Sequence, residues 1–225
     1  MRENVKITNV RKLHLGCGEI YLPGYINIDF PQSKHTVQEN AKVDLYADIN
    51  KLKYKPNSIG EIRLHHVFEH FERPVACALL VSWRSWLTVG GRLRIEVPDF
   101  DRTALNVINP FTSFRTKTVA LRHIFGSNEA LWAVHFEGWS KNRLTEILET
   151  IGFRLVKTRK NSWKGTYNID ITAVKTESVL SVADYYRQVR DYLGNFTLDE
   201  SEGEKRILMV WMQKYNRQIK LSFAK

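Results

Sequence analysis

The sequence predicts an α/β fold built around a mostly parallel sheet. Short apolar segments that suit buried strands alternate with helical patterning, which is the arrangement that α/β folds require. Several of these segments end on a glycine turn or an acidic residue, as strands do when their carboxyl ends form a ligand site. The chain has 225 residues, of which 43% are hydrophobic and 12% aromatic, so it can bury a sizeable core.

The first predicted strands follow one another closely. Residues 12–18 run into a glycine-rich turn, residues 25–29 end on a carboxylate, and residues 43–47 directly precede another. Only eight residues separate Gly18 from Asn27, too few for the full crossover helix that usually joins parallel strands. We therefore expect a single helical turn or an ordered loop at this point.

A fourth strand is predicted over residues 59–67, and a helix over residues 73–87 follows it. The helix is indicated by apolar side chains at helical spacing, namely Val75, Leu79, Leu80, Trp83 and Leu87. We expect the glycine pair at 90–91 to end this helix before a strand over residues 92–97.

The pattern then lapses for about forty residues. Residues 100–139 mix aromatic side chains with arginine, lysine and histidine, which is more typical of a lid or a substrate-binding insertion than of a scaffold element. Regular structure returns with a helix that Ser140 caps and that continues to Thr150, with Gly152 as its stop signal.

The chain is predicted to close with two strands and a helical tail. The strands cover residues 153–158 and 169–174, and the tail contains two amphipathic helices on either side of an acidic turn. We therefore divide the chain into a main domain, residues 1–177, with the insertion at about 100–139, and a C-terminal extension, residues 178–225.

Charge and cysteine content narrow the classes of function. The formal net charge of +10 favours an anionic partner, which nucleic acid, a phosphorylated metabolite or a membrane surface would each satisfy. Cys17 and Cys77 are too few for a disulfide framework or a cysteine-rich zinc site. No apolar run is long enough to span a bilayer, and the first residues do not resemble a signal peptide, so we expect a cytoplasmic protein.

The first three strand ends predict a site for an adenosine-containing cofactor. They carry the turn Gly16-Cys17-Gly18, then Asp29, then Asp48. Glycines let the backbone approach a ligand, and the two acids suit ribose hydroxyls and an adenine amino group. Tyr21 replaces the third glycine of a dinucleotide fingerprint, and there is no Walker phosphate loop. S-adenosylmethionine (SAM) needs only the turn and the acids.

The ordered motifs resemble those of class I SAM-dependent methyltransferases, and most of all the type-11-like subset associated with cell-surface polysaccharide synthesis. The resemblance covers residues 11 to about 175 and rests on Leu13-His14-Leu15-Gly16-Cys17-Gly18, Leu22-Pro23-Gly24-Tyr25-Ile26-Asn27-Ile28-Asp29, Ala47-Asp48-Ile49, His66-Val67-Phe68-Glu69-His70, Val89-Gly90-Gly91-Arg92-Leu93-Arg94-Ile95-Glu96-Val97-Pro98-Asp99 and Ile151-Gly152-Phe153. It implies a Rossmann-like sheet of seven mostly parallel strands with flanking helices, SAM as cofactor, and O-methylation of a sugar or another small hydroxyl acceptor, free or linked to a phosphate or a lipid.

The resemblance also implies roles for cofactor-binding residues. The turn Gly16-Cys17-Gly18 would pass beside the amino-acid end of SAM, and Asp29 would bind its ribose. Asp48 and Ile49 would flank the adenine, and His65 would lie near the methionine moiety.

A hydroxyl acceptor benefits from a base, for which we consider His135, His66 and Asp99 together with His65. Each also has a structural interpretation: Asp99 suits a helix N-cap, His135 could pin the insertion, and His66 with Glu69 and His70 could fix a helix start. We expect no metal ion, because Asp99 and Asp101 offer only a fragment of the oxygen ligands that Mg²⁺ needs.

Two other classes of function stay open. Methylation of RNA or another nucleic acid is suggested by a basic cluster, Arg154, Lys157, Arg159, Lys160 and Lys164, although we prefer a solvated hairpin as the explanation of this cluster. The chain also lacks the Asn/Asp-Pro-Pro-aromatic and Pro-Cys motifs of familiar nucleic-acid methyltransferases. The other alternative is a non-catalytic binding module that uses the tail, whose apolar stripes suit packing on the domain itself, a homodimer, or peripheral attachment to the inner face of the membrane.

Overall fold

The computed structural model describes residues 10–34, 41–163 and 165–223. Within these residues seven strands form one sheet in the order β3-β2-β1-β4-β5-β7-β6. The strands β1 (Arg11–Leu15), β2 (Ile26–Asp29), β3 (Leu45–Tyr46), β4 (Ile59–His65) and β5 (Leu87–Pro98) pair in parallel. The last two, β6 (Phe153–Trp163) and β7 (Thr166–Lys175), form a hairpin, and β7 joins β5 antiparallel. The predicted α/β fold with a mostly parallel seven-stranded sheet is confirmed.

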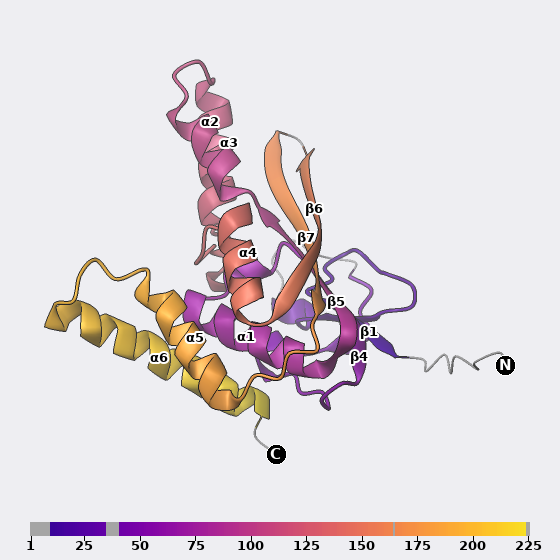
Figure 1. The fold of residues 1–225 in the computed structure, drawn as a ribbon. Helices are drawn as coiled ribbons and strands as arrows, with labels where there is room; N and C mark the ends of the chain where they lie inside the picture. The colour runs from indigo at the N-terminus through magenta and orange to yellow at the C-terminus, as the bar shows by residue number, and fades with distance from the viewer. Residues whose placement is uncertain (1–9, 35–40, 164, 224–225) are drawn as a thin grey trace.

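One face of the sheet is covered by helices. Helix α1 (Arg73–Trp86) is buried along most of its length, and α4 (Lys141–Thr150) packs against β6. The tail helices α5 (Val182–Gly194) and α6 (Glu202–Phe223) lie outside α1 (Figure 1). Tyr215 and Val189 from the tail are buried in the same core as α1, so the apolar stripes of the tail pack on the chain's own domain.

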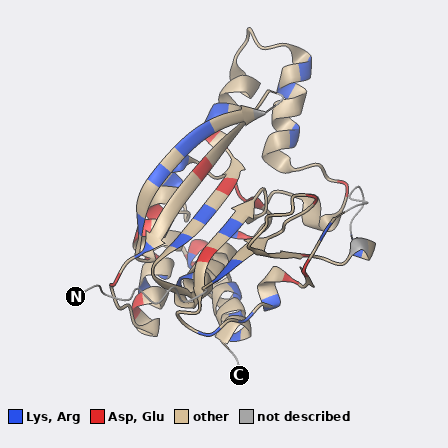
Figure 2. Cartoon of the chain, turned by 90° about the vertical axis from the view of Figure 1, so that its right-hand side faces the viewer, with Lys and Arg blue, Asp and Glu red and all other residues tan. Residues whose placement is uncertain are grey.

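The other face of the sheet carries charged side chains on neighbouring strands (Figure 2). Arg94 on β5 donates two hydrogen bonds to Asp170 on β7, at 2.9 and 2.5 Å, and the Tyr25 hydroxyl donates to Glu61 on β4 at 2.6 Å. Exposed basic residues continue along β6, where Arg154 is one of them. This face is therefore held by polar pairs between strands and not by an apolar layer.

The segment between β1 and β2 is an ordered loop, one of the two arrangements that its length allows. The backbone N–H groups of Gly16 and Cys17 both donate to the carbonyl of Ile28, at 2.9 and 3.1 Å. The second strand is thereby fixed beside the first without a crossover helix, and it pairs with β1 in the expected parallel register.

The glycine pair at 90–91 does not end α1 as predicted. The helix stops at Trp86, and the N–H of Leu87 donates to the carbonyl of Trp83 as β5 begins. Ile59 pairs with Leu87, but Glu61 already pairs with Arg92, so residues 88–91 bulge from the ladder. Gly90 has φ +74, a conformation that glycine adopts readily, so the pair serves this bulge.

The insertion is more regular than the sequence indicates. It forms a helical hairpin of α2 (Phe100–Ile108) and α3 (Phe114–Phe125), which projects from the body of the molecule (Figure 1). Asp99 and Ser113 cap the two helices with their side chains. The expectation of a segment without regular elements is therefore wrong. The two helices pack mainly on each other, which leaves few apolar positions facing the sheet, and Phe111 at the tip of the hairpin is 95% exposed. No helix among the described residues is long and apolar enough to cross a membrane.

Candidate functional site

The carboxyl ends of the parallel strands border a small cavity of about 200 Å³. Gly16 lies on its wall after β1, Asp29 at the end of β2, and Asp48 with Ile49 after β3. Four residues predicted to bind the cofactor thus line one cavity, which we call the cofactor cavity. Cys17 and Gly18 do not line it, although they belong to the same turn.

The glycine turn is held by Asp29. One carboxylate oxygen of Asp29 accepts from the N–H of Gly18 at 2.6 Å, and the other accepts from the N–H of Phe30 at 2.7 Å. A Cβ atom on Gly16 would overlap the side chain of Val67, and Gly16 has φ +66, so the close approach there requires glycine. Burial raises the pKa of Cys17 to about 12, which leaves this thiol protonated and unreactive.

Asp48 has a structural role as well as a place on the cavity wall. It caps the short 3-10 helix η2 (Ile49–Lys51), accepting from the backbone N–H of Asn50 at 2.9 Å and from the Asn50 side chain at 3.1 Å. Ile49, the next residue, is buried and also lines the cavity. The position of this carboxylate is therefore fixed before any ligand arrives.

A second cavity of about 870 Å³, which we call the acceptor cavity, adjoins the first. Its wall includes five of the six histidines that lie in the described residues: His65, His66, His70, His123 and His135. His66, His70 and Trp132 line both cavities, so these three side chains separate one space from the other. His65, expected beside the cofactor, lines the acceptor cavity, where its Nε2 lies 2.9 Å from a carboxylate oxygen of Glu96.

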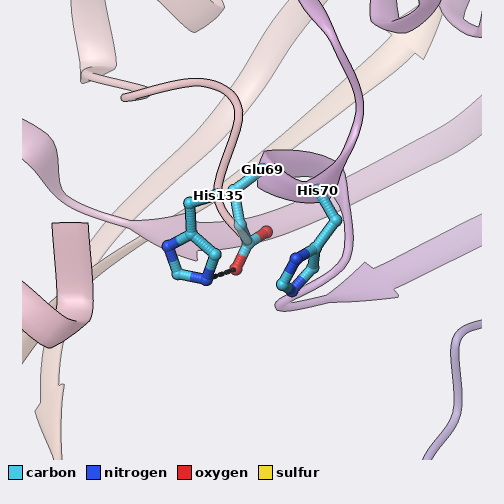
Figure 3. A group of neighbouring side chains, drawn as sticks. All are labelled: Glu69, His70 and His135. Carbon is cyan, nitrogen blue, oxygen red and sulfur yellow. Dashed lines mark ion pairs between the residues drawn. The ribbon is translucent and has the colours of Figure 1, made fainter. Parts of the chain in front are cut away.

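A cluster around Glu69 occupies the wall between the cavities. Glu69 lies in the 3-10 helix η3 (Phe68–His70) and is 1% exposed. Its Oε1 atom is 3.3 Å from Nδ1 of His66 and 3.9 Å from Nε2 of His135. Figure 3 shows His135 and His70 on either side of the carboxylate. His66 has φ +51, an uncommon value for a residue with a side chain, which is a sign of strain at a functional site.

The buried surroundings perturb the ionisation of this cluster. Burial lowers the pKa of His135, so its imidazole is neutral near pH 7. Burial would by itself raise the pKa of Glu69 and lower that of His66. Their mutual contact outweighs burial in both, so the pKa of Glu69 is lowered and that of His66 is raised. The cluster thus contains a carboxylate and a neutral histidine that can accept a proton.

Asp99, the remaining candidate base, has a structural role. It is 2% exposed and caps α2, accepting from the N–H of Arg102 at 3.3 Å, and it lines neither of the two cavities. The sequence suggests that Asp99 is either a catalytic base or a helix N-cap, and the structure shows the N-cap.

Comparison with known proteins identifies the fold. No protein-family model matches the chain, and no curated protein matches its sequence. Solved structures do match. A SAM-dependent methyltransferase from Methanosarcina mazei is 12% identical with a TM-score of 0.51, covering 75% of this chain and 93% of that one. Another from Mesorhizobium loti is 12% identical with a TM-score of 0.51, covering 74% and 91%.

A further match is a chain in the complex between the Haloferax volcanii Trm112 methyltransferase activator and a methyltransferase. It is 12% identical with a TM-score of 0.52, covering 77% of this chain and 85% of that one. The chain therefore has the Rossmann-like fold of SAM-dependent methyltransferases, as its motifs imply. At such low identity the similarity extends to the fold alone.

Several residues of the site were not singled out from the sequence. The sequence offers a helix start as the interpretation of Glu69 and His70, and it indicates no role for Glu96, His123 or Trp132. His123 lies in α3 and Trp132 in the 3-10 helix η4 (Leu131–Ala133) that follows it, so both come from the insertion and reach the acceptor cavity only when this segment folds against the sheet. Three histidines and one glutamate within the six residues His65-His66-Val67-Phe68-Glu69-His70 are the sequence feature that indicates a functional role for Glu69 and His70.

Proposed function

We propose that this chain is a SAM-dependent methyltransferase that methylates a hydroxyl group of a small polar acceptor, a sugar in the first instance. The observation that carries the proposal is the pair of adjoining cavities. The one at the strand ends has the glycine turn and the acids, and the larger one is reached across His66, His70 and Trp132. Two reactants bound in these spaces would meet at their common wall.

The residues of the cofactor cavity fit SAM. Asp29 would accept hydrogen bonds from the ribose hydroxyls, Asp48 and Ile49 would flank the adenine, and Gly16 would leave room for the amino-acid end. No phosphate-binding loop is present in the sequence, in agreement with a cofactor that has no phosphates. When bound, SAM supplies an electrophilic methyl group on a sulfonium.

The lining of the acceptor cavity supports a hydroxylated ligand. Besides the histidines, its wall includes four residues whose side chains can hydrogen-bond to hydroxyl groups, namely Asn161, Ser162, Thr166 and Asn168. The guanidinium of Arg122, on the same wall, can bind a phosphate or a carboxylate. The volume of about 870 Å³ is that of a small-molecule site. Neutral His135, or His66, would take the proton of the hydroxyl as general base.

Calorimetric titration with SAM and with S-adenosylhomocysteine tests the cofactor. We expect saturable binding of one molecule per chain and none of NAD, which serves as the control for nucleotide binding in general. Production of S-adenosylhomocysteine with nucleotide sugars and lipid-linked sugars then tests the acceptor. Failure to bind either SAM or its product would overturn the proposal and would favour the non-catalytic binding module.

Methylation of RNA is the second candidate, because a specific surface favours it. Arg154, Lys157, Arg159 and Lys160 are all exposed on β6, whereas Lys164 lies outside the described residues. Such a strip can bind a phosphate backbone, and binding would then weaken steeply with salt. A salt-sensitive, nanomolar gel shift with RNA, together with methyl transfer to it, would favour this candidate over a sugar.

Attachment to an anionic membrane through the exposed side of α6 stays a prediction.

A further inference from the structure

The cluster of Glu69, His70 and His135 has the composition of a metal site. Each residue offers one ligand atom, and the three atoms lie within 4.8 Å of one another. In a tetrahedral site with bonds of about 2.0–2.2 Å, two ligand atoms lie about 3.3–3.6 Å apart. Side-chain movements that shorten these separations by about an ångström would bring all three into contact with one ion, and Figure 3 shows the two imidazoles on either side of the carboxylate.

Both imidazoles are oriented as metal ligands are. Nδ1 of His70 lies 3.1 Å from the carbonyl oxygen of Val134, and Nδ1 of His135 lies 3.1 Å from the carbonyl oxygen of His123. A carbonyl only accepts, so Nδ1 carries the hydrogen in both rings and Nε2 keeps its lone pair. Ligating histidines usually donate their other N–H to a carbonyl or carboxylate in this way. The contacts with these two carbonyls use only the Nδ1 atoms of His70 and His135. The Nε2 atom of each ring is therefore the one that would bind a metal ion.

The third ligand is a buried carboxylate that lacks hydrogen bonds. Glu69 is 1% exposed, and neither of its side-chain oxygens has a hydrogen-bond partner. The nearest cationic group is His66, whose Nδ1 lies 3.3 Å away with poor alignment. A buried carboxylate is costly unless a positive charge and directed contacts compensate it, and a bound cation supplies both.

We propose that Glu69, His70 and His135 bind a divalent first-row transition metal ion, with zinc as the first candidate. Two imidazoles and one carboxylate on one side of the ion suit zinc or iron far better than Mg²⁺, and they leave coordination positions open. The expectation of no metal ion rests on the scarcity of oxygen ligands for Mg²⁺ around Asp99 and Asp101. The nitrogen ligands come together only when the insertion places His135 beside η3.

The position of the ion gives it a role, which rests on the proposed function. His70 lines both cavities and His135 lines the acceptor cavity, so the open coordination positions face the acceptor. A hydroxyl group bound there would have its pKa lowered, as a zinc-bound water does, and its proton would leave to solvent. His135, whose Nε2 atom would then bind the ion, would not be the general base. The ion would hold the acceptor oxygen in place and assist its deprotonation.

The test is metal binding measured directly on the purified full chain. After removal of metals with a chelator, the protein is titrated with Zn²⁺ by calorimetry and with Co²⁺ by visible absorption, whose bands report the coordination. We expect one ion per chain, and a loss of affinity of at least tenfold in Glu69→Gln, His70→Ala and His135→Ala. His65→Ala is the matched control, because His65 lines the same cavity but pairs with Glu96.

Two outcomes would overturn the proposal. One is wild-type protein that binds neither ion, and the other is His65→Ala losing as much affinity as His135→Ala, which would indicate adventitious binding to the histidines. SAM binding is measured on the metal-free protein and on each variant. A variant that binds SAM is folded, so His70→Ala and His135→Ala decide the question even if Glu69→Gln does not fold. Metal binding without SAM binding would refute the proposed function alone, and the reverse would refute the metal site alone.

Discussion

Replacing Asp29 by alanine is expected to weaken SAM binding far more than it weakens the fold. The carboxylate lines the cofactor cavity and would accept a hydrogen bond from each ribose hydroxyl. Hydrogen bonds to a charged group contribute about 1.5–3 kcal/mol each, so the loss of two amounts to about 3–6 kcal/mol. Since 1.36 kcal/mol is a factor of ten, affinity should fall by about two to four orders of magnitude in calorimetric titration.

The same substitution also has a structural cost. Asp29 accepts from the N–H groups of Gly18 and Phe30, which an alanine would leave without these partners. Asp44→Ala is the control, because Asp44 supports the neighbouring strand β2 by accepting from the backbone N–H of Asn27 at 2.8 Å without lining the cavity. We expect Asp44→Ala to lower thermal stability while SAM affinity stays near that of wild type. Equal losses of affinity in both variants, or unchanged affinity in Asp29→Ala, would refute the assignment of Asp29 to the ribose.

Three further predictions concern the packing around the site. Arg84→Met should lower the free energy of unfolding in urea by about 3–6 kcal/mol, because Arg84 is 4% exposed and its guanidinium donates to the carbonyls of Gly152 and Ser178, each such bond contributing about 1.5–3 kcal/mol; exposed Arg92→Met should change it little. Phe111→Ser should leave the melting temperature within a degree or two, since this side chain is 95% exposed; a large loss of stability would mean that the hairpin tip packs on something. Trp132→Ala should weaken SAM binding by about tenfold, as expected for losing an aromatic wall of the cofactor cavity, and unchanged affinity would place the cofactor elsewhere.

The strand ends could be predicted because their chemistry is local. Gly16, Asp29 and Asp48 each follow directly from a strand, and parallel strands bring their carboxyl ends to one edge whatever the details of packing. The acceptor side could not be predicted in the same way. His123 and His135 come from the insertion, and their positions depend on two helices that pack on each other over residues whose spacing gave no clear helical signal. The sequence indicates that Asp99 can cap a helix. It does not indicate that the Asp99 side chain lines neither cavity.

The segment from His66 to His70 explains why the two cavities share a wall. Its central residue, Phe68, is fully buried and stacks on Trp139, with ring centroids 4.9 Å apart, so it anchors the segment in the core. His66 precedes it with a positive φ, and Glu69 and His70 follow it in a tight 3-10 turn. His66 and His70 thereby line both cavities, while Glu69 is buried between them and His135. The stack on Trp139 also joins this turn to the end of the insertion, whose backbone at Phe136 donates to the carbonyl of Glu69 at 2.9 Å. A change at Phe68 would therefore displace His66, Glu69 and His135 together, although Phe68 touches neither cavity.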